Sequence, residues 1–524
     1  MHQILENLAS EHEILPTKLW NAGREMSRRF LSAERWILPF FPAHNPSPIS
    51  RLSRDVLREI FLWSLCADGF RSLNHPGQLA LEPLTLSHVS SHWRDIAIST
   101  PSLWSTIWVD RPQEAHIPMV ELWLERSRQC PLILYLRQTS PPLPGQQQFA
   151  PFPDPREYEL TDEILLLLGE HLHRWKRITF LFYKGTQRAL LNLPEIATAA
   201  PLLDHVQLSV KTWDVGDSLM IERIMYSYAS VKSIVGHPFM TQECLCWARL
   251  TILDAKQLAS SINSYLGVLT HCPSLRRAEI RCAQDRLDAP FIPPSRRGRL
   301  RLQHLSSLTV YADRVDLRSL LDGLILPKLE GLVLRYSYAP RRSGDPQAVW
   351  RLLTCSACVL QRFSLKDVAA TIDNDYHISY LQSPQMASLV ELYMQVNLTD
   401  KVTKFLTLGN AEDGLPRMLP NLQVISLKDI RGDHLDELEL YRMVVSRFAG
   451  PGPDRNGRYS GALIHAFFSL RVKGHSASPV LPWLVERCRD RLDLRIYLDD
   501  CEDRNVKVGW YTSPPIPGGY LAEG

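Results

Sequence analysis

The sequence carries no excess of charge of either sign. Its 59 Lys and Arg residues are nearly balanced by 56 Asp and Glu residues, which leaves a formal net charge of +3. Proteins that bind nucleic acid or acidic membranes over a broad surface usually carry a marked basic excess. We therefore expect neither nucleic acid nor a membrane as a partner.

The sequence also lacks a long apolar segment. Its most apolar run covers residues 164–168, far short of the roughly 20 residues that cross a bilayer. Glu6, Glu11 and Glu13 interrupt the stretch in which a signal peptide would need an apolar core. The ten cysteines are scattered, unlike those of small disulfide-rich secreted domains. These features predict a protein of the cytosol or nucleus with reduced thiols.

No familiar catalytic or cofactor motif is present. The sequence contains no P-loop, no dinucleotide-binding glycine fingerprint, no nucleophile elbow and no paired-histidine metalloprotease helix. Cys355 and Cys358 have the spacing of half a zinc site, but no second pair follows to complete four ligands. We therefore expect no catalytic residue, cofactor or metal. The alternative is an enzyme whose site is assembled from distant residues, which a deep polar pocket with strongly shifted pKa values would reveal.

Proline is commoner than glycine, at 37 residues against 25, and two proline-rich stretches divide the chain. They cover residues 39–48 and 141–155, and both disfavour regular structure. The predicted organisation is a helical segment with a linker over 1–48, a helical domain over 49–110, a connecting segment with a Pro-rich loop over 111–155, a repeat domain over 156–500 and a tail over 501–524.

The helical domain has recognisable helix boundaries. Ser53 can cap a first helix, and Ser90 or Ser91 can begin a later one. That later helix must end before Pro101, because the residue preceding a proline avoids the helical conformation. Apolar residues recur at helical spacing between these boundaries. They are Val56, Leu57, Ile60, Phe61 and Leu65 in the first helix, and Val89, Trp93 and Ala97 in the later one.

Three short pieces of this domain, in order, resemble the F-box. They are LSRDVLREIF at 52–61, VSSHWRDIA at 89–97 and SLW at 102–104. The segment TPSLWSTI at 100–107 resembles a large group of fungal F-box proteins. One departure is Ser53, where the family usually has a proline that preorganises the first helical turn; a serine can cap the turn instead.

The resemblance implies a non-catalytic adaptor. An F-box docks on a Skp-family adaptor, which links it to the cullin scaffold of a ubiquitin ligase, while the rest of the chain holds a client protein. The resemblance implies that Leu52, Leu57, Ile60 and Trp93 contribute to this docking. The alternative for each side chain is a place in the protein's own core. The alternative for the whole chain is a scaffold that binds a Skp-family adaptor but recruits no ligase.

An apolar–x–x–apolar–x–apolar pattern recurs through the rest of the chain. Most units begin 24 to 33 residues after the previous one, and a single step of 44 predicts an insertion or a degraded repeat. Leucine-rich repeats have periods of about 20–29 residues. The predicted fold is therefore an α+β or α/β chain, with a helical F-box followed by an irregular leucine-rich-repeat solenoid whose parallel strands form a curved sheet. Another α/β region with buried parallel strands is the alternative. The units begin at Trp175, Leu203, Trp247, Leu275, Leu305, Leu329, Leu360, Leu389 and Leu422.

The strand residues between the inward positions would line the concave face of such a solenoid. In this register, Arg and Lys outnumber Glu on that face. A basic face favours acidic or phosphorylated partners through charge-assisted hydrogen bonds, and ordinary solvated charge is the alternative. The candidate client-binding residues are Arg249, Arg277, Arg281, Arg335, Arg362 and Lys366.

Overall fold

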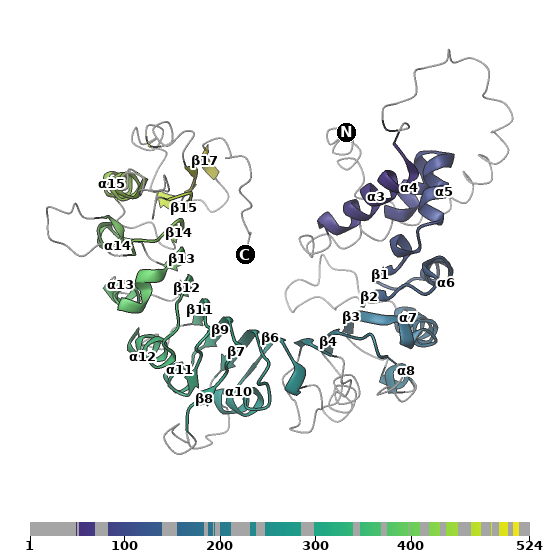
Figure 1. Ribbon diagram of the computed structural model, residues 1–524, viewed down its shortest axis with the longest axis horizontal. Helices are drawn as coiled ribbons and strands as arrows, with labels where there is room; N and C mark the ends of the chain where they lie inside the picture. The colour runs from purple at the N-terminus through teal and green to yellow at the C-terminus, as the bar shows by residue number, and fades with distance from the viewer. Residues whose placement is uncertain are drawn as a thin grey trace, which may run out of the picture.

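The chain forms an open arc with strands along its inner side and helices along its outer side (Figure 1). This computed structural model describes residues 49, 52–68, 82–138, 155–182, 187–191, 193, 200–210, 231–236, 247–283, 298–338, 346–367, 375–396, 398–408, 419–429, 436–448, 463–472, 484, 492–500 and 507–512. The helix predicted within residues 1–48 lies outside the described residues.

In the described part of the chain, a 15-stranded sheet runs the length of the arc in sequence order. Its strands pair in parallel from β1 to β16, and β17 pairs antiparallel with β16. The sheet therefore continues beyond residue 500, where a tail was predicted. The strands are β1 Thr106–Asp110, β2 Leu132–Arg137, β3 Trp175–Phe182, β4 His205–Val210, β5 Ser233–Gly236, β6 Ile252–Ser260, β7 Arg277–Ala283, β9 Ser307–Asp313, β11 Gly331–Tyr338, β12 Arg362–Asp367, β13 Glu391–Val396, β14 Val424–Asp429, β15 His465–Val472, β16 Asp493–Asp500 and β17 Lys507–Thr512.

Most connections between neighbouring strands carry a helix, which packs on the outer side of the sheet (Figure 1). This alternation confirms the predicted solenoid with a curved parallel sheet. The outer helices are α6 His116–Ser127, α7 Pro155–Gly169, α8 Gln187–Leu191, α10 Ile262–Leu269, α11 Arg318–Asp322, α12 Pro346–Ser356, α13 Asp375–Leu381, α14 Asp400–Leu406 and α15 Glu437–Phe448. The N-terminal end of the arc carries α3 Arg54–Asp68, α4 Glu82–Val89 and α5 Ser91–Ile98.

The apolar pattern of the repeats forms one continuous core. In β12, Phe363 and Leu365 are buried between the sheet and the helices, and the alternate residues Arg362, Ser364 and Lys366 point to the inner side of the arc. Leu332 lies opposite Phe363, and Leu392 lies opposite it on the other side. Each repeat thus covers the apolar residues of its neighbours, which a single repeat cannot do alone. The first apolar positions predicted from Leu275 to Leu422 are buried as well.

The step of 44 residues contains a complete strand that the sequence pattern missed. It is β5, in which Ile234 lies opposite Val206 of β4 and Leu253 of β6. Gly236, opposite Leu208, occupies the third position of this repeat, so only two of the three apolar residues of the pattern are present. The 44-residue step is therefore a degraded repeat, one of the two explanations expected.

The sheet begins earlier than the predicted repeat domain. Strands β1 and β2 lie within residues 49–110 and 111–155; they pair with each other, and β2 also pairs with β3. Buried Arg174 joins this region to β3, because its guanidinium donates to the carbonyl of Cys130 at 3.1 Å and to the hydroxyl of Ser127 at 2.5 Å. The predicted start of the repeats at residue 156 therefore does not separate two structural units.

Trp104 joins the N-terminal helices to the sheet. Its side chain is completely buried, its indole Nε1 donates to the carbonyl of Ala97 at 2.8 Å, and its ring meets that of Trp123 edge-on at 4.9 Å. Trp104 also stands three residues before buried Ile107 of β1. It therefore occupies the first apolar position of a repeat, and Ile107 occupies the second. The same side chain thus completes the helical block and begins the solenoid.

We predict that Trp104→Ala destabilises this junction by about 3–5 kcal/mol, because truncating a buried tryptophan leaves a large cavity. Native-state amide exchange of residues 106–110 and 132–137 measures the effect locally. Trp63→Ala is the matched control, since Trp63 is 70% exposed and surface substitutions usually change stability by about 0.5 kcal/mol or less. Equal exchange rates in the two variants would contradict the prediction.

Candidate binding surfaces

The helical block exposes an apolar stripe on α3. Val56, Ile60 and Trp63 are 46%, 42% and 70% exposed, and their spacing places them on one side of the helix. Leu57 and Phe61 point the other way, into the core of the block. Exposed large apolar side chains that gather on one face mark a surface able to bind another protein.

The structure gives the four docking candidates different environments. Ile60 is exposed, whereas Leu57 is completely buried, so Leu57 supports α3 from inside and offers no surface to a partner. Leu52 is half-buried against the core, and Trp93 is half-buried with its ring 4.8 Å from that of Phe61. The sequence pattern missed Val56 and Trp63 as members of the exposed stripe, although helical spacing from Ile60 identifies both.

Hydrogen bonds at the helix starts hold this block in shape. The Ser53 hydroxyl accepts from the backbone N–H of Val56 at 3.4 Å, and the Ser90 hydroxyl accepts from that of Trp93 at 3.1 Å. Both serines therefore satisfy an otherwise unpaired N–H in the first turn, as predicted for helix caps. At the position where the F-box resemblance would place a proline, Ser53 thus stabilises the first turn of α3 by capping it.

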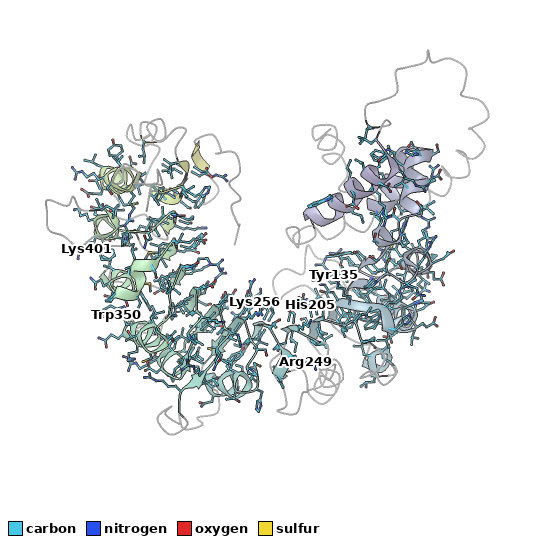
Figure 2. All side chains as sticks on the ribbon, viewed as in Figure 1. Tyr135, His205, Arg249, Lys256, Trp350 and Lys401 are labelled. Carbon is cyan, nitrogen blue, oxygen red and sulfur yellow. The ribbon has the colours of Figure 1, made fainter. Side chains whose placement is uncertain are left out.

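Side chains of the strands extend to the inner side of the arc (Figure 2). On β7–β14, residues that lie directly opposite one another on neighbouring strands form three rows on this inner face. We call them the first, second and third concave rows. The first row is Arg277, Ser307, Gly331, Arg362, Glu391 and Val424; the second is Glu279, Thr309, Val333, Ser364, Tyr393 and Ser426; the third is Arg281, Tyr311, Arg335, Lys366, Gln395 and Lys428. Five of the six client-binding candidates thus share this face.

Arg249 is the exception and corrects the predicted register of one repeat. It lies in the 3₁₀ turn Trp247–Arg249, before β6 begins. The buried residues of β6 are Leu253 and Ala255, whereas Ile252 is 38% exposed and stands opposite Arg277 in the first row. Trp247, Leu250 and Leu253 are spaced by three residues each, so the sequence admits two registers, and burial of Leu253 selects the second.

Basic side chains of β6 and β7 are neutralised within the protein. Lys256 Nζ lies 2.8 Å from Asp254 and 3.2 Å from Glu279, and the Arg277 guanidinium lies 2.5 Å from Glu279. Arg281 Nε lies 2.5 Å from a carboxylate oxygen of Asp313. Two of the client-binding candidates, Arg277 and Arg281, are therefore engaged by internal carboxylates.

Glu279 is the centre of this neutral cluster. Burial alone would raise the pKa of its carboxyl group, but the hydrogen bond from Arg277 and the positive charges of Lys256 and Arg277 outweigh burial and hold the pKa below its usual value of 4.5. The carboxylate is thus ionised at neutral pH, in a position where only 7% of the residue is exposed. A buried carboxylate of this kind stays charged only because it is paired.

The basic side chains over β11, β12 and β14 form a second group on the inner face. Within the described part of the chain, no carboxylate lies within ion-pair distance of Arg335, Arg362, Lys366 or Lys428. Burial and then the positive charges of Arg335 and Lys428 lower the pKa of Lys366. Glu391 lies beside Arg362 in the first row, but its carboxylate accepts a hydrogen bond from the Tyr393 hydroxyl at 3.1 Å.

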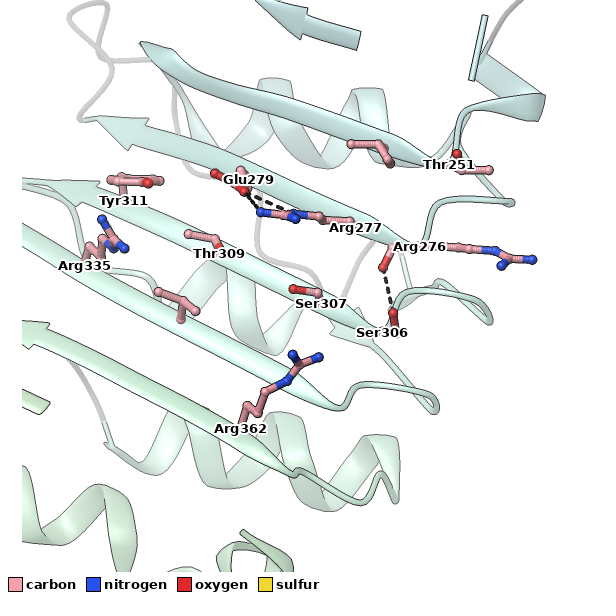
Figure 3. A pocket seen from close by; sticks show the side chains of 12 residues that line it. Thr251, Arg276, Arg277, Glu279, Ser306, Ser307, Thr309, Tyr311, Arg335 and Arg362 are labelled. Carbon is pink, nitrogen blue, oxygen red and sulfur yellow. Dashed lines mark hydrogen bonds and ion pairs between the residues drawn. The ribbon is translucent and has the colours of Figure 1, made fainter. Parts of the chain in front are cut away.

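A hollow of about 520 Å³ lies between the paired and unpaired parts of the inner face (Figure 3). Arg277 stands on one side and Arg335 and Arg362 on the other. Its space comes from small side chains, because Ser307 and Gly331 separate the two arginines of the first row. The hollow is lined by Thr251, Ile252, Arg276, Arg277, Glu279, Ser306, Ser307, Thr309, Tyr311, Val333, Arg335 and Arg362.

The groups with the largest pKa shifts lie beneath the sheet. Burial raises the pKa of the Cys282 thiol to about 12 and also raises the pKa of the Tyr265 hydroxyl, which donates to the carbonyl of Ala255 at 3.2 Å. Both residues are completely buried, and neither lines the hollow. Across the described ranges, no group of three or more His, Cys, Asp or Glu side chains is placed to hold a metal ion.

None of the helices in the described part of the chain combines the length and apolar character that crossing a membrane requires. No protein-family model matches the sequence, and comparison with curated proteins finds no match.

We predict that Glu279→Gln lowers stability in a pH-dependent way. Because the folded-state pKa of Glu279 is depressed, its contribution is fully present above the usual carboxyl pKa and is lost as the pH falls through the folded value. The gap in unfolding free energy between wild type and variant should therefore be widest at pH 7 and close below pH 4.5. Urea unfolding at several pH values measures it, and a gap independent of pH would contradict the prediction.

Proposed function

We propose that this protein is a non-catalytic adaptor of a cullin-type ubiquitin ligase. The helical block docks on a Skp-family adaptor, and the inner face of the solenoid holds a client protein. The observation that carries the proposal is the exposed stripe of Val56, Ile60 and Trp63 on a helix whose sequence resembles the first helix of an F-box.

The energy available from the stripe supports such docking. Fully burying one large apolar side chain at an interface contributes roughly 1.5–3 kcal/mol. Three half-exposed or exposed side chains on α3 therefore offer enough for a specific contact, and half-buried Leu52 and Trp93 lie in the same block. The block itself is well packed around Phe61, Trp104 and Ile96, so it can present the stripe without unfolding.

The solenoid supplies the client-binding part of the proposal. A curved parallel sheet offers a long concave surface on a rigid frame, as repeat proteins do in general. Its mechanism would be proximity: a client held on the same body as the ligase core is presented to the charged conjugating enzyme at high effective concentration. This role requires no catalytic group on the chain.

We predict that the double variant Val56→Asp, Ile60→Asp loses capture of a co-expressed Skp-family adaptor by more than a hundredfold. Two buried apolar side chains are worth about 3 kcal/mol or more, and each 1.4 kcal/mol corresponds to about a factor of ten. Affinity purification with quantification of the adaptor measures the loss. Leu52 is left unchanged because it also packs on the core.

The matched control is Leu166→Asp, Val359→Asp, which introduces the same charges at exposed apolar positions outside the helical block. Circular dichroism establishes that both variants remain folded. Undiminished capture by the Val56/Ile60 variant, or equal loss in the control, would contradict docking through α3. Capture of the adaptor without any cullin would favour the non-ligase scaffold instead.

A further inference from the structure

The third concave row concentrates positive charge on four neighbouring strands. Arg335, Lys366, Gln395 and Lys428 lie directly opposite one another on β11, β12, β13 and β14. Neighbouring strands are about 4.8 Å apart, so Arg335 and Lys366 can contact the same small anion. Every side chain of this run donates hydrogen bonds, and three of the four carry a positive charge.

This charge differs from ordinary solvated charge in how it is held. Arg335 extends over the ring of Tyr311, with its guanidinium carbon 5.4 Å from the ring centroid, which positions the group without neutralising it. Burial lowers the pKa of Lys366, and the positive charges of Arg335 and Lys428 lower it further. Carboxylates neutralise Lys256, Arg277 and Arg281 on the same face, whereas among the residues that the structure describes none pairs with Arg335, Lys366 or Lys428.

We propose that the third concave row binds a phosphorylated segment of a client protein, with the phosphate monoester held between Arg335 and Lys366. The inference rests on the proposed function, because it names the client chemistry for the same inner face. The planar guanidinium can donate two parallel hydrogen bonds to phosphate oxygens, while the lysine ammonium acts as a point charge. Gln395 can donate a further hydrogen bond, and Lys428 can pair with an acidic residue of the segment.

Carboxylates elsewhere on the inner face restrict where the phosphate of such a segment can bind. Glu391 stands in the first row of the strand that carries Gln395 in the third, about 13 Å away at 3.3 Å per residue. Glu279 and Asp313 already bind Arg277 and Arg281 on the preceding strands. A phosphate is therefore attracted to the third row and repelled from the Glu391 side of the face.

A phosphopeptide fits this surface better than a nucleic acid does. Nucleic-acid affinity depends on contacts with many phosphates along a strand, whereas the unpaired charge here is confined to a few residues on a chain with a net charge of +3. The hollow beside Arg335 and Arg362 can also accept a peptide side chain next to the phosphorylated residue. A short segment with one or two negative groups matches the site in size and charge.

The test uses the full chain and two fluorescein-labelled peptide pools with degenerate flanking residues, one centred on phosphoserine and one on serine. Fluorescence anisotropy should show at least tenfold tighter binding of the phosphoserine pool. The variant Arg335→Gln, Lys366→Met should lose at least tenfold of that affinity. Lys328→Met removes an exposed lysine before β11 and Lys404→Met removes an exposed lysine of α14; both should stay within twofold of wild type.

Equal binding of the two pools would overturn the proposal, as would equal losses in the control variants. Displacement of the phosphoserine pool by a single-stranded oligonucleotide at lower concentration than by unlabelled phosphopeptide would also overturn it, in favour of nucleic acid. Weaker competition by inorganic phosphate than by phosphopeptide supports a peptide source. Skp-adaptor capture is measured on the same preparations, so retained capture without phosphate discrimination refutes this inference alone and leaves the adaptor function intact.

Discussion

In-register pairing of parallel strands is the constraint on which the rest of this molecule depends. Leu308, Leu332, Phe363 and Leu392 stand opposite one another in the core, and a slip of one residue would turn each of them out to solvent. The same register fixes which side chains lie on the inner face of the arc, because they alternate with the buried ones along each strand. The order of residues in the concave rows therefore follows directly from the packing of the core.

This constraint explains why two adjoining parts of one surface differ in charge. Arg277 and Glu279 are two residues apart on one strand, and Arg281 meets Asp313 at the end of the next strand. Further along, the register places Lys366 between Arg335 and Gln395, so neither of its neighbours in the row is a carboxylate. The contrast depends on which residue types the repeats bring into one row, and the overall charge of the chain gives no sign of it.

Much of the fold could be predicted from the sequence because leucines mark the buried positions from Leu275 to Leu422. The prediction failed in two repeats whose residues do not follow the apolar pattern clearly. Gly236 replaces an apolar residue in β5, and exposed Ile252 imitates a buried position in β6. The candidate surface was predicted less completely, because pairing depends on contacts such as that of Arg281 with Asp313, 32 residues away. Leu57 and Ile60 are three residues apart and therefore neighbours on the helix surface, so helical spacing could not show that one is buried and the other exposed.

The buried junction at Trp104 determines how the two candidate surfaces could work together. Trp104 packs against Trp123 of α6 and donates to Ala97 of α5, so the helical block continues into β1 without an intervening flexible linker. A flexible linker would spread a bound client over many positions and lower its effective concentration. A packed junction instead holds α3, which carries the exposed stripe, at a fixed place at one end of the arc, with β7–β14, which carry the third concave row, further along it (Figure 1). Under the proposed function, the shape of the arc, set by the number and curvature of the repeats between them, would determine where a client is presented to the ligase.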